Sequence, residues 1–345
     1  MSGRARTGVL VMAHGTPARP DEIEAFYTRI RRGRPPTPEL LADLVRRYEA
    51  IGGTSPLAAR TAAQVAGVAA RLEAMAPGAY LVRYGAKHTE PSIEDAAAAL
   101  AAEPLEAVVG VVLTPHRSSM GSGEYLDRAE AALAAAGGLP FVRVPQWYDA
   151  EGFAPLLAAR VRAAVDRLEG TGTPTVLFTA HSLPERVRAA GDPYPDQVAD
   201  SAARVAGAAG LGPAGIPWSV AWQSAGRTPE PWIGPDLLAE LRRLAAGGTG
   251  AVVVCPIGFV ADHLEVLFDV DVEARHVAEE VGLALERTES LNDDPEFTAL
   301  LAEVVVRAAR RAGPPSGAPE SPGAPESPGA PESPGAPESP GVVDG

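Results

Sequence analysis

The feature that most constrains the fold is an alternation, along almost the whole chain, of short apolar runs and longer amphipathic segments. The apolar runs predict strands at Gly8–Ala13, Tyr80–Gly85, Ala107–Leu113, Phe141–Val144, Thr175–Ala180, Trp218–Gln223, Ala251–Cys255 and Leu283–Arg287. The amphipathic segments predict helices at Asp21–Arg32, Pro38–Ile51, Leu57–Met75, Gly123–Ala136, Phe153–Leu168, Pro195–Ala209, Pro235–Ala246 and Pro295–Ala312. Strands that alternate with helices in this way are typical of βαβ units, in which helices cover a parallel sheet. The sequence therefore predicts an α/β protein.

The predicted strands divide into two groups, one on each side of residue 145. Four strands precede this point and four follow it, so we expect two similar Rossmann-like domains at residues 1–145 and 146–312. Each would hold a four-stranded parallel sheet flanked by helices. Residues 313–345 contain the sequence Gly-Ala-Pro-Glu-Ser-Pro four times. Such a segment has little apolar surface to bury, and we expect a disordered C-terminal tail.

Composition narrows the classes of function. The formal net charge of −14 argues against nucleic acid as a partner. Apolar stretches are too short for a membrane span, and the first residues lack the long apolar stretch of a signal peptide, so we expect a cytoplasmic protein. The one cysteine, Cys255, lies in a predicted strand. A single thiol excludes an internal disulfide and an iron–sulfur cluster built on several thiolates, and favours a small core residue.

Histidines gather where the predicted strands end. Five of the six follow a strand or the loop after it, namely His14, His88, His116, His181 and His263. In an open parallel sheet, ligands bind beyond the carboxyl ends of the strands. Each histidine taken alone is more often a structural residue than a ligand. Together they indicate a site in a cleft between the two predicted domains.

Three carboxylates follow the predicted strand Ala251–Cys255. Glu265, Asp269 and Glu273 have the spacing i, i+4, i+8, which places them on one face of a helix. Like charges at this spacing cost about 0.2–0.5 kcal/mol per pair, and a bound cation would offset this cost. An ordinary solvated acidic face is an equally good interpretation. Carboxylate combined with imidazole suits Fe(II), Zn(II), Co(II) or Cu(II), without selecting one of them.

Several stretches match the motifs of one protein family. They are Gly15–Pro17, Tyr27–Gly33, Arg47–Gly53, Ser55–Leu57, Lys87-His88 with Glu90-Pro91, Ala180–Glu185, Gly191–Gln197, Trp222–Ser224, Pro231-Trp232 with Gly234–Asp236, and Gly258–Glu265. On these motifs, the chain from Gly8 to about Ala312 resembles the ferrochelatases, most closely the soluble coproporphyrin III enzymes of Gram-positive bacteria. The resemblance implies a chelatase-like form of the two-domain fold and a monomeric cytoplasmic lyase. Its reaction would insert Fe(II) into coproporphyrin III, giving Fe-coproporphyrin III (coprohaem) in haem biosynthesis, with a coprohaem decarboxylase as the downstream partner.

The same resemblance implies roles for individual residues. His181 and Glu265 would be catalytic and would bind the metal, and Asp269 and Glu273 would deliver cations, with Mg(II) or another divalent ion at this acidic face. Imidazole suits the first role because its pKa of about 6.5 lets it bind metal or accept a proton at neutral pH. The porphyrin-binding residues would be His14, Arg31, Arg47, Tyr48, Ser55, Tyr125, Lys87 and His88. Arginine suits a substrate with four propionates because its guanidinium pairs with carboxylates through two hydrogen bonds.

One position departs from the family pattern. Where the coproporphyrin enzymes have a tyrosine that serves as an axial ligand of the product iron, this chain has His14 within Ala13–Pro17. Imidazole also binds haem iron, but the metal preference could differ. Two alternatives therefore stay open. One is a chelatase of the same fold that prefers Co, Ni or Zn, and the other is a porphyrin or haem carrier without catalysis.

Overall fold

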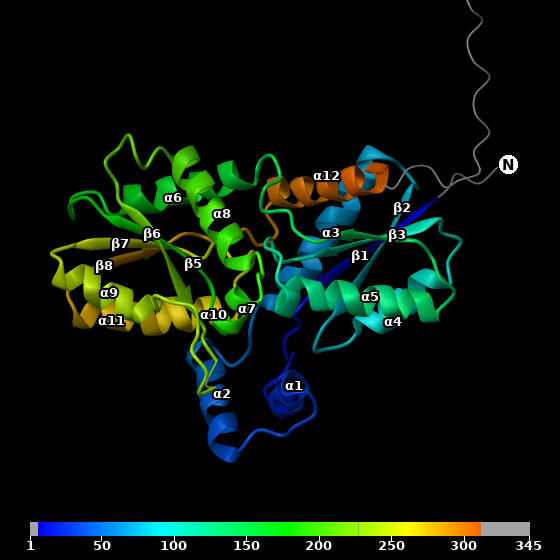
Figure 1. Cartoon of the computed structure of the whole chain (residues 1–345), viewed down its shortest axis with the longest axis horizontal. Helices are drawn as coiled ribbons and strands as arrows, with labels where there is room; N and C mark the ends of the chain where they lie inside the picture. Colours follow the sequence, from blue (N-terminus) through cyan, green and yellow to red (C-terminus); the bar gives the residue numbers. More distant parts are fainter. Residues whose placement is uncertain (1–5, 227, 312–345) are drawn as a thin grey trace, which may run out of the picture. The chain divides into compact units, whose positions relative to one another are not determined.

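Two parallel four-stranded sheets form the framework of the chain (Figure 1). The first sheet has the order β2-β1-β3-β4 and the second the order β6-β5-β7-β8. All neighbouring strands are parallel. The strands are β1 (Thr7–Ala13), β2 (Tyr80–Ala86), β3 (Ala107–Val112), β4 (Phe141–Val144), β5 (Thr175–His181), β6 (Trp218–Gln223), β7 (Ala251–Cys255) and β8 (Ala284–Arg287). The prediction of an α/β fold with two such sheets is confirmed.

This computed structural model describes residues 6–226 and 228–311, all of which belong to one compact unit. The segment predicted to be a disordered tail, residues 313–345, lies outside the described residues. Among the helices of the described part, none is long and apolar enough to cross a membrane.

Helices surround both sheets. In the first half of the chain they are α1 (Ile23–Ile30), preceded by a 3₁₀ turn at Pro20–Glu22, then α2 (Pro38–Ala50), α3 (Leu57–Met75), α4 (Ile93–Ala101), a π-helical turn at Ser119–Gly123, and α5 (Glu124–Ala135). In the second half they are α6 (Phe153–Arg167), α7 (Arg186–Ala189), α8 (Tyr194–Ala209), α9 (Leu237–Ala246), α10 (Leu264–Leu267), a π-helical turn at Asp269–Ala274, α11 (Arg275–Glu280) and α12 (Pro295–Arg311). The predicted helices are all present, whereas α4 and α7 were not predicted.

The inner strands β1, β3, β5 and β7 are mainly apolar and buried because helices cover both of their faces. Alternate residues of β1 enter different clusters: Val9 and Val11 belong to one core cluster, and Leu10 and Met12 to another. Burial on both sides removes the alternation of polar and apolar residues that a half-exposed strand would show. This explains why the inner strands stood out in the sequence as nearly continuous apolar runs.

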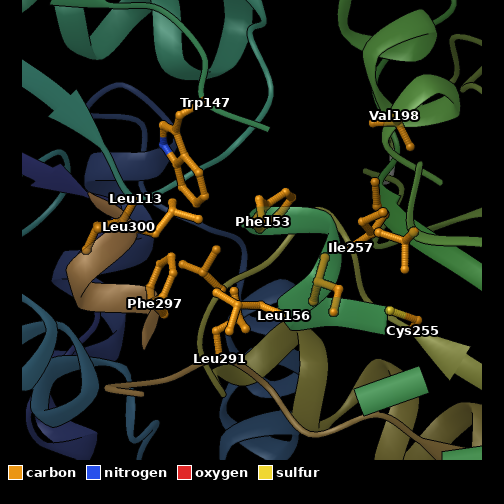
Figure 2. Close-up of a cluster of buried hydrophobic side chains, with 14 of the residues drawn as sticks. Leu113, Trp147, Phe153, Leu156, Val198, Cys255, Ile257, Leu291, Phe297 and Leu300 are labelled. Carbon is orange, nitrogen blue, oxygen red and sulfur yellow. The ribbon is translucent and has the colours of Figure 1, made fainter. Parts of the chain in front are cut away.

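The larger core cluster extends through both halves of the chain (Figure 2). Trp147, just after the first sheet, donates a hydrogen bond of 2.8 Å from Nε1 to the Val112 carbonyl. Its ring packs against Phe153 of α6 and Phe297 of α12, with centroid separations of 5.2 and 5.8 Å. Helix α12 also packs against α3 of the first half (Figure 1). The division at residue 145 stays a prediction, and the last helix of the predicted second domain packs on the first.

The acidic segment after β7 differs from the regular α-helix that the sequence predicted. The chain is α-helical only over Leu264–Leu267 and then π-helical over Asp269–Ala274. The Glu273 amide accordingly donates to the Phe268 carbonyl, five residues earlier, at 2.9 Å. A π turn holds more residues per turn than an α turn, so the simple i, i+4, i+8 stripe is wrong in detail.

Candidate active site

His181 ends β5, the strand at the centre of the second sheet. Its Nδ1 lies against the Ser182 carbonyl oxygen. A carbonyl can only accept, so Nδ1 carries the hydrogen. The Nε2 atom then faces the Glu265 carboxylate, 3.5 Å from Oε1. Tyr194, the first residue of α8, fixes the backbone from behind by donating from its hydroxyl to the His181 carbonyl at 3.1 Å.

Glu265 reaches His181 because the loop after β7 passes very close to β5. Gly258 in this loop leaves no room for a side chain, since a Cβ there would lie 2.8 Å from the Cβ of Ala180. The loop then enters α10, whose first turn holds Glu265. Gln223, at the end of β6, donates from Nε2 to the Glu265 carbonyl at 2.8 Å. The catalytic pair expected from the resemblance is thus adjacent in space.

A second histidine faces the same carboxylate. Nε2 of His263 lies 3.6 Å from Oε2 of Glu265, while its Nδ1 contacts the Ala261 carbonyl oxygen at 2.9 Å. Glu265 therefore has one imidazole beside each carboxylate oxygen. His263 was noticed as one of the histidines near strand ends, but neither periodicity nor spacing assigned it a role.

The charges of this group depend on one another. Burial by itself lowers the pKa of His181, but the Glu265 carboxylate outweighs it and raises the pKa to about 9. Burial by itself raises the pKa of Glu265, whereas His181 and His263 bring it well below its usual range. Without a metal, the pair is therefore an imidazolium next to a carboxylate at neutral pH. A cation that binds here must displace the proton of His181.

The first half of the chain contributes a different set of side chains. His14 follows β1, and its ring centroid lies 4.7 Å from that of His88, which follows β2. Burial lowers the pKa of both, to about 3 for His88, where His14 and Lys87 add to the effect. Glu265 raises the pKa of His14 against this trend. The charge of Glu265 thus acts on the histidine that ends the central strand of the other sheet.

Tyrosines from both halves lie within the field of the same carboxylate. Burial raises the pKa of Tyr48 to about 12 and that of Tyr125 and Tyr194 as well, and Glu265 contributes to all three shifts. The hydroxyl oxygens of Tyr48 and Thr16 lie 3.4 Å apart. The charge of Glu265 therefore acts on the expected porphyrin-binding residues Tyr48, Tyr125 and His14.

Three other expected porphyrin-binding residues, Lys87, Ser55 and Arg31, make different kinds of contact. Lys87 lies over the ring of Tyr125, with Nζ 4.9 Å from the ring centroid. The buried Ser55 accepts a hydrogen bond of 3.2 Å from the Leu57 amide at the start of α3. Arg31 caps the end of α1 and donates to the Arg34 carbonyl at 3.3 Å. Its contacts are local, so they do not place it with Glu265.

Arg47 of α2 is engaged by the acidic segment. Its Nη2 lies 3.0 Å from Oδ1 of Asp269 and 3.8 Å from Oε2 of Glu273, and its guanidinium lies over the Phe268 ring. The hydroxyl of Ser224 donates to the other oxygen of Asp269. Burial raises the pKa of Asp269 to about 6, although Arg47 opposes the shift. Each oxygen of the Asp269 carboxylate thus accepts one hydrogen bond, from Arg47 and from Ser224. A divalent ion at this acidic face stays a prediction.

The His181–Glu265 pair forms an open site. Within residues 6–226 and 228–311, no three His, Cys, Asp or Glu side chains are grouped so as to hold a metal ion. A cation at this pair would therefore keep positions for water or substrate. A cavity of about 450 Å³ lies in the first half of the chain, lined by residues that include Thr16, Phe26 and Thr61.

Comparison with known proteins places this geometry in a family. The family model described as ferrochelatase matches residues 6–309. The chain belongs to the ferrochelatase family. The coproporphyrin III ferrochelatase of Geobacillus thermodenitrificans is 44% identical over 310 residues, covering 89% of this chain and 97% of that protein. The corresponding protein of Bacillus subtilis is 42% identical over 312 residues, covering 89% and 99%. A ferrochelatase of Herpetosiphon aurantiacus is 42% identical over 306 residues, covering 87% and 98%.

Solved structures with low sequence identity share the fold of this ferrochelatase-family chain. SirB from Bacillus subtilis with Fe³⁺ has a TM-score of 0.54 at 10% identity, covering 89% of this chain and 97% of that one. CbiX, described as the terminal enzyme of sirohaem biosynthesis in denitrifying bacteria, has a TM-score of 0.50 at 17% identity, covering 87% and 99%. At these identities the likeness concerns the fold alone.

Proposed function

We propose that this member of the ferrochelatase family inserts Fe(II) into coproporphyrin III and releases Fe-coproporphyrin III in haem biosynthesis. The observation that carries the proposal is the open pair of His181 and Glu265, 3.5 Å apart. The identities of 42–44% to coproporphyrin III ferrochelatases support the substrate.

Proton balance explains why the reaction needs this group of side chains. Insertion of a divalent ion releases two protons from the pyrrole nitrogens of the macrocycle. Nε2 of His181 lies 3.5 Å and Nε2 of His263 lies 3.6 Å from an oxygen of the Glu265 carboxylate. All three side chains can hold protons or donate lone pairs. The proton that His181 carries in the free protein must leave before its Nε2 can bind Fe(II). Metal entry and proton departure therefore take place at the same atom.

The macrocycle would lie between this group and the side chains of the first half. We propose that Tyr48, Tyr125, Ser55 and His88 line its surface, and that Arg31, Arg47 and Lys87 pair with its propionates. Arg47 would then exchange Asp269 and Glu273 for a propionate. Asp269 and Glu273 would attract hydrated iron toward Glu265 without binding it directly.

We also propose that the protein works as a cytoplasmic monomer and passes its product to a coprohaem decarboxylase. No iron–sulfur cluster would take part, because the one cysteine of the chain, Cys255, is fully buried in β7. The domain boundary near residue 145 remains part of this proposal.

Metallation of coproporphyrin III under anaerobic conditions tests the function. We expect the absorption bands of the free porphyrin to be replaced by those of the iron complex far faster than in a protein-free control. His181→Ala and Glu265→Gln should each abolish the acceleration. His276→Ala, which changes an exposed histidine of α11, is the matched control and should keep it. A parental protein no faster than the blank would rule out the function.

His14 gives specific grounds for a second candidate, a chelatase that prefers Co, Ni or Zn. Comparing initial rates with these ions and Fe(II) at equal concentration, in the parent and in His14→Tyr, distinguishes the two. The same iron preference in both forms would remove this candidate. If His181→Ala bound porphyrin and metallated it at the parental rate, a carrier function would be favoured instead.

A further inference from the structure

His14 and His88 form a pair of imidazoles beyond the carboxyl end of the first sheet. The pairing of β1 with β2 continues past both strands, because the His88 amide donates to the His14 carbonyl at 3.1 Å. The two ring planes are inclined by 57°. The ring of Phe26 packs edge-on against both, at 5.8 and 6.3 Å. Backbone and aromatic contacts therefore hold the two imidazoles next to each other.

The local backbone also determines which nitrogen of His14 can bind a ligand. Its Nδ1 lies 3.1 Å from the Gly15 carbonyl oxygen, so Nδ1 carries the hydrogen and Nε2 keeps the lone pair. Gly15 has a φ of +82°, and a Cβ there would lie 2.3 Å from the Thr89 hydroxyl oxygen, so only glycine fits. A hydrogen bond from one ring nitrogen to a carbonyl is the usual way in which proteins orient a metal-binding histidine.

The separation of the rings suits a shared cation. A metal–nitrogen bond of about 2.1 Å plus roughly 1.1 Å from nitrogen to ring centre places each centroid about 3.2 Å from the metal. Two such rings are about 4.5 Å apart at a ligand angle of 90° and about 5.2 Å apart at the tetrahedral angle. The observed separation is 4.7 Å. The separation of His14 and His88 therefore lies within the range for two imidazoles that share one ion.

The positively charged side chains near His88 are each paired with a carboxylate. Each of the three cations around His88 has its own carboxylate: Lys87 with Glu124 at 2.8 Å, Arg29 with Glu90 at 3.8 Å, and Arg128 with Glu94 at 2.7 Å. Arg29 and Arg128 also donate to backbone carbonyls of His88 and Lys87. The local field thus opposes a bound cation much less than three unpaired charges would.

We propose that His14 and His88 bind one borderline divalent cation, such as Ni(II), Cu(II) or Zn(II), with water as the remaining ligands. This second metal site contains neither His181 nor Glu265 and requires no porphyrin. Although both histidines are also expected to line the porphyrin, cation binding by the porphyrin-free protein can be measured separately from the function proposed above.

Calorimetric titration with Ni(II) tests the site, using the full chain without an affinity tag. In a His181→Ala/Glu265→Gln background we expect one bound equivalent. Adding His14→Phe or His88→Phe should weaken binding at least tenfold. The added control His276→Ala should leave it unchanged. Equal Ni(II) affinity in the background protein and in both added variants would overturn the proposal, as would the absence of binding in the background protein.

Electron paramagnetic resonance of the Cu(II)-loaded background protein gives a second readout that remains usable if a phenylalanine variant fails to fold. Two nitrogen ligands should be resolved, and His88→Gln should leave one. A spectrum without two nitrogen ligands would contradict the site. Failure of the parent to metallate coproporphyrin III would rule out the proposed function without changing either result.

Discussion

His116 offers a sharp test of how burial controls stability. It follows β3, is only 2% exposed, and neither of its ring nitrogens has a hydrogen-bond partner among the described residues. Tyr148 stacks on the ring at 5.3 Å and Tyr194 packs edge-on at 6.1 Å. Burial lowers the pKa of His116 to about 3. The imidazole therefore stays neutral in the folded protein over the whole physiological range.

The size of the effect follows from the pKa difference between the two states. The unfolded chain binds a proton at His116 with a pKa of about 6.5, so between pH 6.5 and 3 the unfolded state holds more protons and stability falls as the pH falls. From pH 7 to pH 5 this one residue should remove about 2 kcal/mol of unfolding free energy. His116→Phe keeps the aromatic contacts and eliminates the titration, so its stability relative to the parent should rise by that amount over the same interval.

Urea unfolding at pH 7 and pH 5, at constant ionic strength, measures this difference. His276→Phe is the matched control, since that ring is 71% exposed and its loss should leave the pH dependence of the parent. If the free-energy gap between His116→Phe and the parent were the same at both pH values, the reasoning from burial would be refuted.

Three further substitutions test contacts around the site. Gly258→Val should displace the loop that carries Glu265, lowering metallation at least tenfold while fluorescence titration still shows porphyrin binding; an unchanged rate would contradict the close packing. Tyr194→Phe should cost about 1 kcal/mol in a thermal melt through the lost hydrogen bond to His181, and an unaltered melting temperature would speak against it. Arg47→Gln should cost about 2–4 kcal/mol because it leaves the Asp269 carboxylate buried beside Ser224 alone. Combining it with Asp269→Asn should restore part of this loss, and a strictly additive double variant would refute the pairing.

The strands could be predicted because each has a local signature. A strand such as β7, covered on both faces, is a continuous apolar run, and all five of its residues are buried. Helix α4 was missed although five of its nine residues are alanine, the residue that most favours a helix. Ser92 and Asp95, which form a capping box at its start, were the available signal. The π turn after Phe268 has no such signal, since it accompanies a contact with Arg47 of a distant helix.

The candidate site was only partly accessible to sequence reasoning. The rule that ligands bind at the carboxyl ends of parallel strands located His14 and His181. The carboxylate spacing singled out Glu265, and the family motifs gave it a catalytic role. The distance between His181 and Glu265 depends on the close approach of Gly258 to β5, which spacing cannot reveal. The engagement of Arg47 by Asp269 likewise joins residues far apart in the chain. Their roles in metal and porphyrin binding remain predictions.

Equivalent positions of the two halves hold histidines whose pKa values are shifted in opposite directions. The sheet orders β2-β1-β3-β4 and β6-β5-β7-β8 are equivalent, so β1 corresponds to β5. Each of these central strands leads to a histidine, His14 in one half and His181 in the other. A carboxylate beside His181 raises its pKa to about 9, whereas burial lowers that of His14. One imidazole therefore carries a proton and the other a lone pair at neutral pH. Equivalent strand ends of the two halves thus hold, from one residue type, a protonated and a neutral imidazole.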